Sequence, residues 1–376
     1  MKFASVPKER DQAIDILRGF ALVTITINHL TGFAFQKGAL GMAFPTLSHW
    51  GFSSAAEIFF LVSGYLVGAV YLRDDRLDRF TRQMFARAGR LYVYNALLFL
   101  MILPICWLSP QLARLSFFRY FIEGGPTALA SFGVMYLQPY CLEILATYTL
   151  LMIVAPIFAL GLVRRPIITL SLSLILYICA YNYQWLKLPG GIPGGEWRWN
   201  FSPASWQFLF FGAMAAGRYR LADRLKALFI ADRRWFLAAV ALFATLTAIY
   251  IAQTELAPLG LDFRIWGQSK VRVGPIRIIH ALSVCWFALG ALWLWPGLQR
   301  GWIGRHFAMI GSCSLQSFVA SVVISYIAGL IWVEFAPTYR SYILLCTASV
   351  IALGMFARIY EMVRQRPAME LRPARV

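Results

Sequence analysis

The chain contains 376 residues, of which 60% are hydrophobic and 14% are charged, and its mean hydropathy is +0.63. Soluble globular domains contain about 45–50% apolar and about 25% charged residues, so this composition excludes that class and predicts a polytopic membrane protein. The net charge of +18 would also suit a nucleic-acid-binding protein. The basic residues, however, fall mostly in connections between apolar segments, which favours a role in membrane topology and predicts no nucleic-acid partner.

Apolar segments of about 18 to 25 residues, long enough to cross about 30 Å of hydrocarbon, recur along the chain. Neither an internal repeat nor a low-complexity linker separates them. We therefore predict an all-α fold, a polytopic helical bundle that forms a single integral membrane domain over residues 1–376, with a tail at about 361–376. The predicted transmembrane helices are ten, near residues 13–35, 53–72, 86–108, 140–163, 166–184, 204–218, 235–253, 276–296, 306–332 and 341–360.

The orientation of the chain follows from the positions of its basic residues. If the N-terminus is cytoplasmic, ten helices place both termini inside, and 25 of the 35 Lys and Arg residues fall on the inner side. Such an excess is the positive-inside pattern. The first apolar segment contains Asp15 and Arg18 and lacks a small-residue cleavage pattern, so we expect it to act as an uncleaved insertion signal.

Six cysteines, at positions 106, 141, 179, 285, 313 and 346, show no paired close spacing. This distribution indicates neither a metal site nor a redox motif, and it predicts inert packing inside apolar helices. The alternative left open is a disulfide between Cys106 and Cys141, which both fall near the outer ends of predicted helices.

The long connection over residues 185–207 is rich in Gly, Pro and Trp. Its tryptophans, Trp197, Trp199 and Trp206, are predicted to form an interfacial aromatic belt. Stacking of these rings on a sugar is the alternative.

Two ionisable residues, Arg18 and His29, occur in the first predicted helix. Ten residues separate them, and a step of eleven positions makes about three full turns, so both side chains lie on one stripe, roughly 16 Å apart. Ionisable groups are costly inside a bilayer and usually line a cavity or pair with each other, so this stripe predicts a site. Asp15 can pair with Arg18 on the same face, either to orient it or as an ordinary ion pair. For His29 the alternative is a buried structural histidine.

Glu57 falls about one turn inside the outer end of the second predicted helix, at a depth similar to that of His29. A carboxylate beside a histidine orients the ring and raises its basicity, which is the arrangement that a general base needs. The alternative is a glutamate at a helix N-terminus that faces the lipid headgroups.

Arg87 and Arg90 lie one turn apart at the inner end of the third predicted helix. Arginines at this spacing can bind phosphate groups bidentately, as a nucleotide-bearing donor would require. Contact with anionic lipid is the alternative.

The chain resembles the membrane acyltransferase-3 superfamily, in which an arginine, ten residues and a histidine occur in the first helix. Arg18 and His29 match that motif, AAEIFFLVSGYL at 55–66 resembles the second-helix motif, and Arg87 and Arg90 match the inner RxxR motif. The resemblance is strongest to the OpgC-type branch, the succinyltransferases of osmoregulated periplasmic glucans. The segments that carry it are RDQAIDILRG at 10–19, SSAAEIFFLVSGY at 53–65, YLQPYCLEI at 136–144, WNFSPASWQFLFFGA at 199–213, KVRVGPIRIIHAL at 270–282 and IGSCSLQSF at 310–318. The last departs from the branch pattern, because Ser312 stands where an arginine is usual.

The resemblance implies a multi-pass enzyme of the bacterial inner membrane that uses an acyl-CoA, succinyl-CoA, as a donor substrate rather than a bound cofactor or metal. Arg18, Arg87 and Arg90 would bind this acyl-CoA from the cytoplasm. His29, supported by Glu57 and with Asp15 as an orienting residue, would deprotonate a hydroxyl of a periplasmic glucan for direct transfer. The predicted acceptor-binding residues are Arg277, His280, Trp206, Gln207, Gln138 and Glu143.

Other functions remain open at this stage. Succinyl, acetyl and other short acyl groups end in the same thioester, so an O-acetyltransferase of another envelope polysaccharide is one alternative. A glycan transporter or flippase is a second, although the sequence lacks the symmetric halves that would favour it. A noncatalytic scaffold for glycan assembly is a third. The oligomeric state is left open by the sequence.

Overall fold

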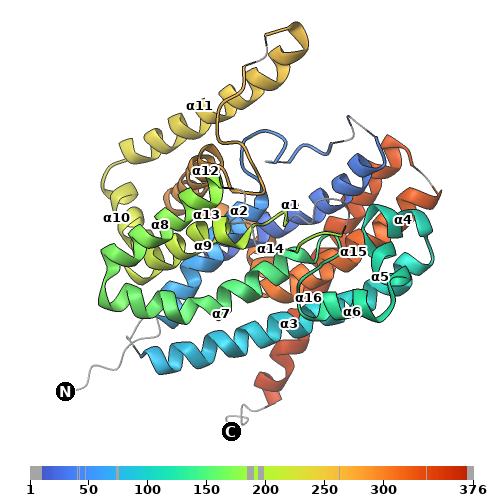
Figure 1. The fold of residues 1–376 in the computed structure, drawn as a ribbon. Helices are drawn as coiled ribbons and strands as arrows, with labels where there is room; N and C mark the ends of the chain where they lie inside the picture. The colour runs from blue at the N-terminus through green and yellow to red at the C-terminus, as the bar shows by residue number, and fades with distance from the viewer. Residues whose placement is uncertain are drawn as a thin grey trace.

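The computed structural model describes residues 11–370 except 40, 42, 47, 73–75, 184–189, 194–198, 262 and 336, with side chains described up to residue 364. Its described elements are helices packed into one bundle, as Figure 1 shows. The first half contains α1 (Gln12–Gln36), α2 (Ala55–Leu66), the π-helical turn η1 (Val67–Tyr71), α3 (Leu77–Trp107), α4 (Pro110–Leu115), α5 (Phe118–Glu123), α6 (Gly125–Gly133), α7 (Glu143–Arg164) and α8 (Pro166–Asn182). The second half contains α9 (Pro203–Arg218), α10 (Leu221–Ala231), α11 (Arg234–Leu256), the 3-10 turn η3 (Ala257–Leu259), α12 (Pro275–Leu294), α13 (Pro296–Arg300), α14 (Trp302–Ser312), α15 (Ser314–Phe335) and α16 (Tyr339–Glu370).

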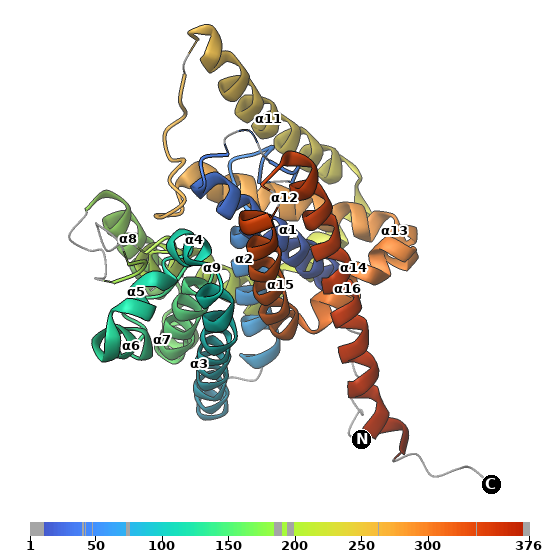
Figure 2. The same cartoon turned by 90° about the vertical axis from the view of Figure 1, so that its right-hand side faces the viewer.

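The first helix, α1, lies at the centre of the bundle. It packs against α2, α12, α14, α15 and α16, so most of its surface is covered by protein. Its start is fixed by Asp11, whose side chain accepts a hydrogen bond from the backbone N–H of Ala13 at 3.0 Å, as an N-cap does. Figure 2 shows the contrast with α11, which projects from the bundle. The helix that carries Arg18 and His29 is therefore held on nearly all sides.

Glycine allows α1 and α14 to approach closely. A Cβ atom on Gly19 would collide with the carbonyl oxygen of Phe307, and one on Gly311 would collide with the carbonyl oxygen of Asp15. Small residues permit this kind of backbone contact between membrane helices. The rotation of α1, and hence the face that carries Arg18, is set by this contact.

Seven helices are long and apolar enough to cross a membrane, which makes the chain a multi-pass membrane protein. They are α1, α3, α7, α11 with η3, α12, α15 and α16. Two shorter apolar helices, Ala55–Tyr71 and Pro166–Asn182, correspond to the second and fifth predicted spans. The all-helical class is confirmed, whereas the count of ten spans and the side on which each terminus lies stay predictions.

The ninth predicted span, 306–332, is not one continuous helix. It is interrupted at Cys313, where α14 ends and α15 begins. Carbonyl groups at the interruption accept hydrogen bonds from nearby hydroxyls: Ser312 Oγ donates to Met309 O at 2.8 Å and Ser317 Oγ to Ile310 O at 3.0 Å. Hydroxyls can satisfy freed backbone groups within a membrane protein in this way. A hydropathy pattern does not detect such a break, because the residues on both sides are apolar.

Other boundaries also differ from the prediction. The third span begins at Leu77 rather than 86, and α16 continues through the predicted tail to Glu370. All six cysteines are free thiols, so no disulfide joins Cys106 to Cys141. The aromatic belt is wrong for Trp199 and Trp206, which are buried in the protein, and Trp197 lies outside the described residues.

Candidate active site

His29 lies in the C-terminal half of α1, between two aromatic rings. Its imidazole meets Tyr140 and Phe318 edge to face, with a centroid distance of 6.4 Å in each case. The ring is half-buried, and neither of its nitrogens hydrogen-bonds to any residue that the structure describes, although Nδ1 is buried. Buried polar atoms are normally paired, so an unpaired ring nitrogen calls for a functional explanation.

The turn before α7 holds the Tyr140 ring against His29. Tyr326 donates its hydroxyl to the backbone carbonyl of Tyr140 at 2.7 Å, and the next residue, Cys141, has a φ of 71°. Non-glycine residues rarely adopt this left-handed conformation, and it occurs most often where the surroundings enforce it. Gly32 gives the tyrosine hydroxyl room beside α1, since a Cβ atom there would collide with it. The packing around His29 is thus fixed from α15 and from this turn.

Glu57 does not support His29 as the sequence predicts. One carboxylate oxygen accepts from Arg277 on α12, at 2.7 Å from Nε and 2.5 Å from Nη2. The other accepts from the backbone N–H of Ser54 at 2.8 Å and from its hydroxyl, which closes a capping box at the start of α2. Because both oxygens are engaged, Glu57 positions Arg277 and joins α2 to α12.

Glu143 is the second buried carboxylate at this end of the bundle. It accepts from Asn200, at 3.0 Å from the backbone N–H and 2.6 Å from the side-chain amide. These bonds hold the described end of the 185–207 connection against the start of α7. Glu143 therefore lies in the wall of the site with its oxygens bonded to the protein.

Lys270, in the loop before α12, is a cation that the sequence reasoning missed. Its charge acts electrostatically on His29, Glu57, Glu143 and Arg277, and its ammonium lies 5.6 Å from the centroid of the Phe201 ring. The lysine is exposed. Desolvation by the surrounding protein lowers the pKa of the ammonium, although Glu57 opposes this effect.

A signal for Lys270 was present in the sequence. It lies in the segment at 270–282 that carries the family resemblance, and it is a lysine on the side of the membrane predicted to hold few basic residues. A basic residue that departs from the topological pattern is a candidate for binding an anion.

Arg18 lies in the N-terminal half of α1, about three turns before His29. It donates to the hydroxyl of Ser314 at the start of α15, and it forms an ion pair with Asp15 at 3.7 Å. The predicted Asp15–Arg18 contact is therefore present. Ser314 directly follows the interruption at Cys313. The helix break therefore positions the hydroxyl that accepts the hydrogen bond from Arg18.

Arg87 and Arg90 are separated by the structure. Arg87 lines a narrow cavity of about 20 Å³ together with Arg18, whereas Arg90 is exposed and does not line it. Arg87 also approaches Tyr71, with Nη1 3.5 Å from the hydroxyl and Cζ 5.9 Å from the ring centroid. Phe318 also lines the cavity, and its ring packs on His29. Phe318 thus connects His29 to the cavity that Arg18 and Arg87 line.

The remaining acceptor candidates are enclosed and bonded to the protein. Trp206 is fully buried and donates to the carbonyl of Val271 at 3.1 Å, which anchors the loop that carries Lys270. Gln207 exchanges hydrogen bonds with Ser173 on α8, with distances of 2.7 and 2.9 Å. These placements give Trp206 and Gln207 supporting roles around the site.

Gln138 is likewise buried. Its carbonyl oxygen accepts from the side chain of Asn95 at 2.8 Å, and its amide donates to the carbonyl of Phe132 at 3.2 Å. It fastens the turn before α7 to α3 and α6.

His280 is enclosed by protein, and one of its two ring nitrogens, Nε2, has no hydrogen-bond partner among the described residues. Its Nδ1 lies 2.7 Å from the hydroxyl of Ser53, and its ring packs against Phe52 and Phe243. The side chain is 1% exposed, so it has almost no surface for a ligand. Arg277, one turn earlier, is the residue of this segment that reaches the polar site.

The described elements define an all-helical, multi-pass membrane protein, in which a half-buried histidine, His29, lies between Tyr140 and Phe318. A family model described as OpgC protein matches residues 10–365, nearly the whole chain. The chain therefore belongs to the OpgC family, which implies a glucan-modifying membrane acyltransferase. No curated protein matches the sequence.

Proposed function

We propose that this protein is an O-acyltransferase of the bacterial inner membrane, which moves a succinyl group from cytoplasmic succinyl-CoA to a hydroxyl of a periplasmic glucan. The observation that carries the proposal is the state of His29. It is held between Tyr140 and Phe318 and has no hydrogen-bond partner among the described residues. An imidazole with an unengaged nitrogen is available to take a proton from a substrate.

The donor would bind from the inner side. Arg18 and Arg87 line the same cavity, so their guanidinium groups can contact the phosphates of the nucleotide. The acyl end would then extend along the cavity toward Phe318 and His29. Because the cavity holds only about 20 Å³, donor binding requires its side chains to move apart.

The chemical step is direct transfer. A ring nitrogen of His29 takes the proton of the sugar hydroxyl while the oxygen attacks the thioester carbonyl carbon. The new C–O bond forms, the C–S bond breaks, and the CoA thiolate leaves and takes the proton back from the imidazolium. Positioning of both substrates at His29 and general base catalysis supply the acceleration, and no acyl-enzyme is required.

Lys270 provides a reason for a succinyl rather than an acetyl group. A succinyl thioester carries a free carboxylate beyond the reacting carbonyl, and Lys270 is a cation whose charge acts at His29. Glu57 and Glu143 are already bonded to Arg277 and to Asn200, which leaves the lysine for a ligand. An ionic contact of this kind selects the acyl chain that has a terminal charge.

Mass spectrometry of periplasmic glucans from cells with and without the protein tests the proposal, with His29→Gln as the inactive variant. One succinyl unit per modified glucose, present only with the intact histidine, is the expected result. Acetyl units, or modification of another envelope polysaccharide, would replace the proposed donor or acceptor. Unchanged glycans in the presence of the folded protein would reject the transferase and favour a transporter or a scaffold.

Lys270→Met tests the assignment of the acyl group separately. Purified protein is offered succinyl-CoA and acetyl-CoA, and the ratio of the two rates is measured. The ratio should fall at least about tenfold in the variant, since one ionic contact to a carboxylate is lost. An equal loss of rate with both donors would show that Lys270 does not discriminate between the two acyl groups.

A further inference from the structure

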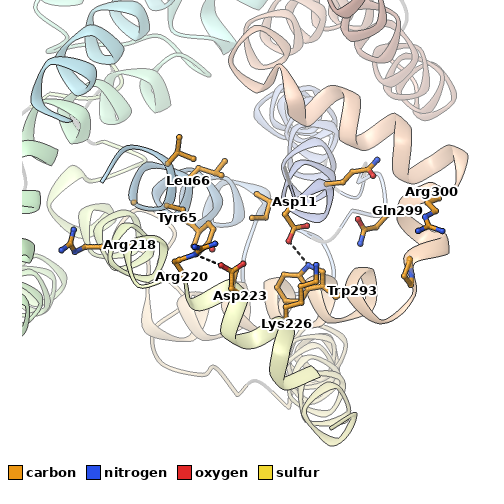
Figure 3. A pocket seen from close by; sticks show the side chains of 17 residues that line it. Asp11, Tyr65, Leu66, Arg218, Arg220, Asp223, Lys226, Trp293, Gln299 and Arg300 are labelled. Carbon is orange, nitrogen blue, oxygen red and sulfur yellow. Dashed lines mark hydrogen bonds and ion pairs between the residues drawn. The ribbon is translucent and has the colours of Figure 1, made fainter. Parts of the chain in front are cut away.

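A large polar cavity lies apart from His29. Its volume is about 1000 Å³, and it is enclosed by the start of α1, the end of α2 with η1, and helices α9, α10, α12 and α13, as Figure 3 shows. None of the residues assigned to catalysis or donor binding lines it. By the positive-inside prediction it opens on the cytoplasmic side.

The charges in this cavity are unbalanced. Asp223 pairs with Arg220 at 2.7 Å, and Asp11 accepts from the indole N–H of Trp293 at 3.1 Å, so both acids are engaged (Figure 3). Lys226 and Arg300 also line the cavity. Within the described part of the chain, neither of these two forms an ion pair or a side-chain hydrogen bond. A bound anion would balance the positive charges of Lys226 and Arg300.

An apolar cavity adjoins the polar one. It has a volume of about 350 Å³ and lies between α1, α2, α9, α10 and α12. Ile14, Tyr65 and Ala222 line both cavities, so the two are adjacent. Away from these shared residues its wall is aliphatic and aromatic apart from Cys285, and it includes Gly212, beside which a Cβ atom would meet open space.

We propose that the two cavities together bind one anionic phospholipid of the inner leaflet. Its phosphate would lie between Lys226 and Arg300, and one acyl chain would occupy the apolar cavity past Tyr65. Basic pockets between membrane helices on the cytoplasmic side attract anionic headgroups, and the adjoining apolar space suits a hydrocarbon chain. A soluble phosphate compound would use the cations but not the apolar cavity.

Native mass spectrometry of the full-length protein in detergent tests this site. The protein is titrated with phosphatidylglycerol and with phosphatidylcholine of the same chains. We expect one phosphatidylglycerol to be retained with at least about tenfold preference, because two cations attract its negatively charged headgroup. Equal retention of the two lipids would overturn the proposal.

Two variants separate the headgroup from the chain. Lys226→Gln with Arg300→Gln should abolish the preference. The matched control removes two exposed arginines at the junction of α7 and α8, Arg164→Gln with Arg165→Gln, and should keep it. Loss of the preference in the control as well would show a nonspecific attraction to basic surface.

Gly212→Leu fills the apolar cavity and should lower retention of phosphatidylglycerol at least about fivefold, because it removes space for several methylene groups. Gly133→Leu, at another helical glycine whose Cβ would meet open space, is the control and should bind as the unmodified protein does. Glycerol phosphate and coenzyme A are added as competitors. Displacement of the lipid by either compound, with Gly212→Leu still binding normally, would assign the cavity to a soluble phosphate and overturn the lipid site.

Monodisperse elution and an unchanged helical circular dichroism signal show that each variant is folded. Because the lipid readout is binding, it does not depend on transferase activity. Failure of the acyltransferase proposal would therefore leave the lipid result standing, and the reverse also holds.

Discussion

The surroundings of His29 and His280 differ, and the difference distinguishes a candidate catalytic histidine from a structural one. Both histidines lie on apolar helices near the polar network of Glu57 and Arg277, and both fall in segments that resemble the family. His280 has its Nδ1 bonded to Ser53 and almost no exposed surface. His29 is half-buried and has no hydrogen-bond partner in the described structure. Each ring has a buried nitrogen without a hydrogen-bond partner among the described residues, Nδ1 of His29 and Nε2 of His280. The two histidines differ in exposed surface, because His29 is half-buried and His280 is almost fully enclosed.

The largest effect is expected from replacing each histidine by glutamine. His29→Gln should lower kcat by about 100- to 10,000-fold, the range attributed to a positioned general base, while the protein remains inserted and folded. His280→Gln should retain kcat within about tenfold, because its ring supports the 51–53 turn and does not reach the substrate. Steady-state rates with purified protein measure both. Equal losses in two folded variants would remove the distinction between the regions.

The Glu57–Arg277 pair joins α2 to α12, the helix that carries His280, so breaking it should affect stability before chemistry. Glu57→Gln leaves the guanidinium without its buried counter-charge and should lower the free energy of unfolding by about 3 kcal/mol. Denaturation in detergent measures this loss. Arg277→Gln in the same chain should recover part of it, because the unpaired charge is then also removed. No recovery in the double variant would show that the two residues act independently.

Arg87 and Arg90, both on α3, allow a similar comparison between two arginines. Arg87 lines the cavity beside Arg18, whereas Arg90 is exposed. Arg87→Ala should raise the apparent KM for the acyl-CoA about tenfold, through the loss of one charge-assisted contact, and Arg90→Ala should change it less than about twofold. Donor titrations at saturating acceptor measure both constants. Equal increases in the apparent KM would show that both arginines bind the donor, as the sequence predicts.

The smallest effect is expected at Ser53. Ser53→Ala removes the hydroxyl that bonds to His280 and should lower the free energy of unfolding by about 1 kcal/mol. Thermal denaturation measures the change, and turnover should stay within about twofold. A loss of turnover comparable to that of His29→Gln would give the His280 region a direct part in the reaction.

Much of the fold and part of the site could be predicted from the sequence. Hydropathy identifies the apolar segments, and a local period of 3.6 residues places Arg18 and His29 on one stripe and brings Asp15 to Arg18. These features depend only on the helix itself. The family motifs indicate the chemistry for the same reason, because they are short and lie within single helices.

The tertiary structure decided which residues meet across helix interfaces. Depth along a helix predicts that Glu57 lies near His29, but the rotation of α2 and α12 gives its carboxylate to Arg277. Spacing predicts that Arg87 and Arg90 act together, yet only Arg87 faces the bundle. Lys270 reaches the site from a loop. Such contacts depend on the packing of several helices at once, and no local periodicity specifies them.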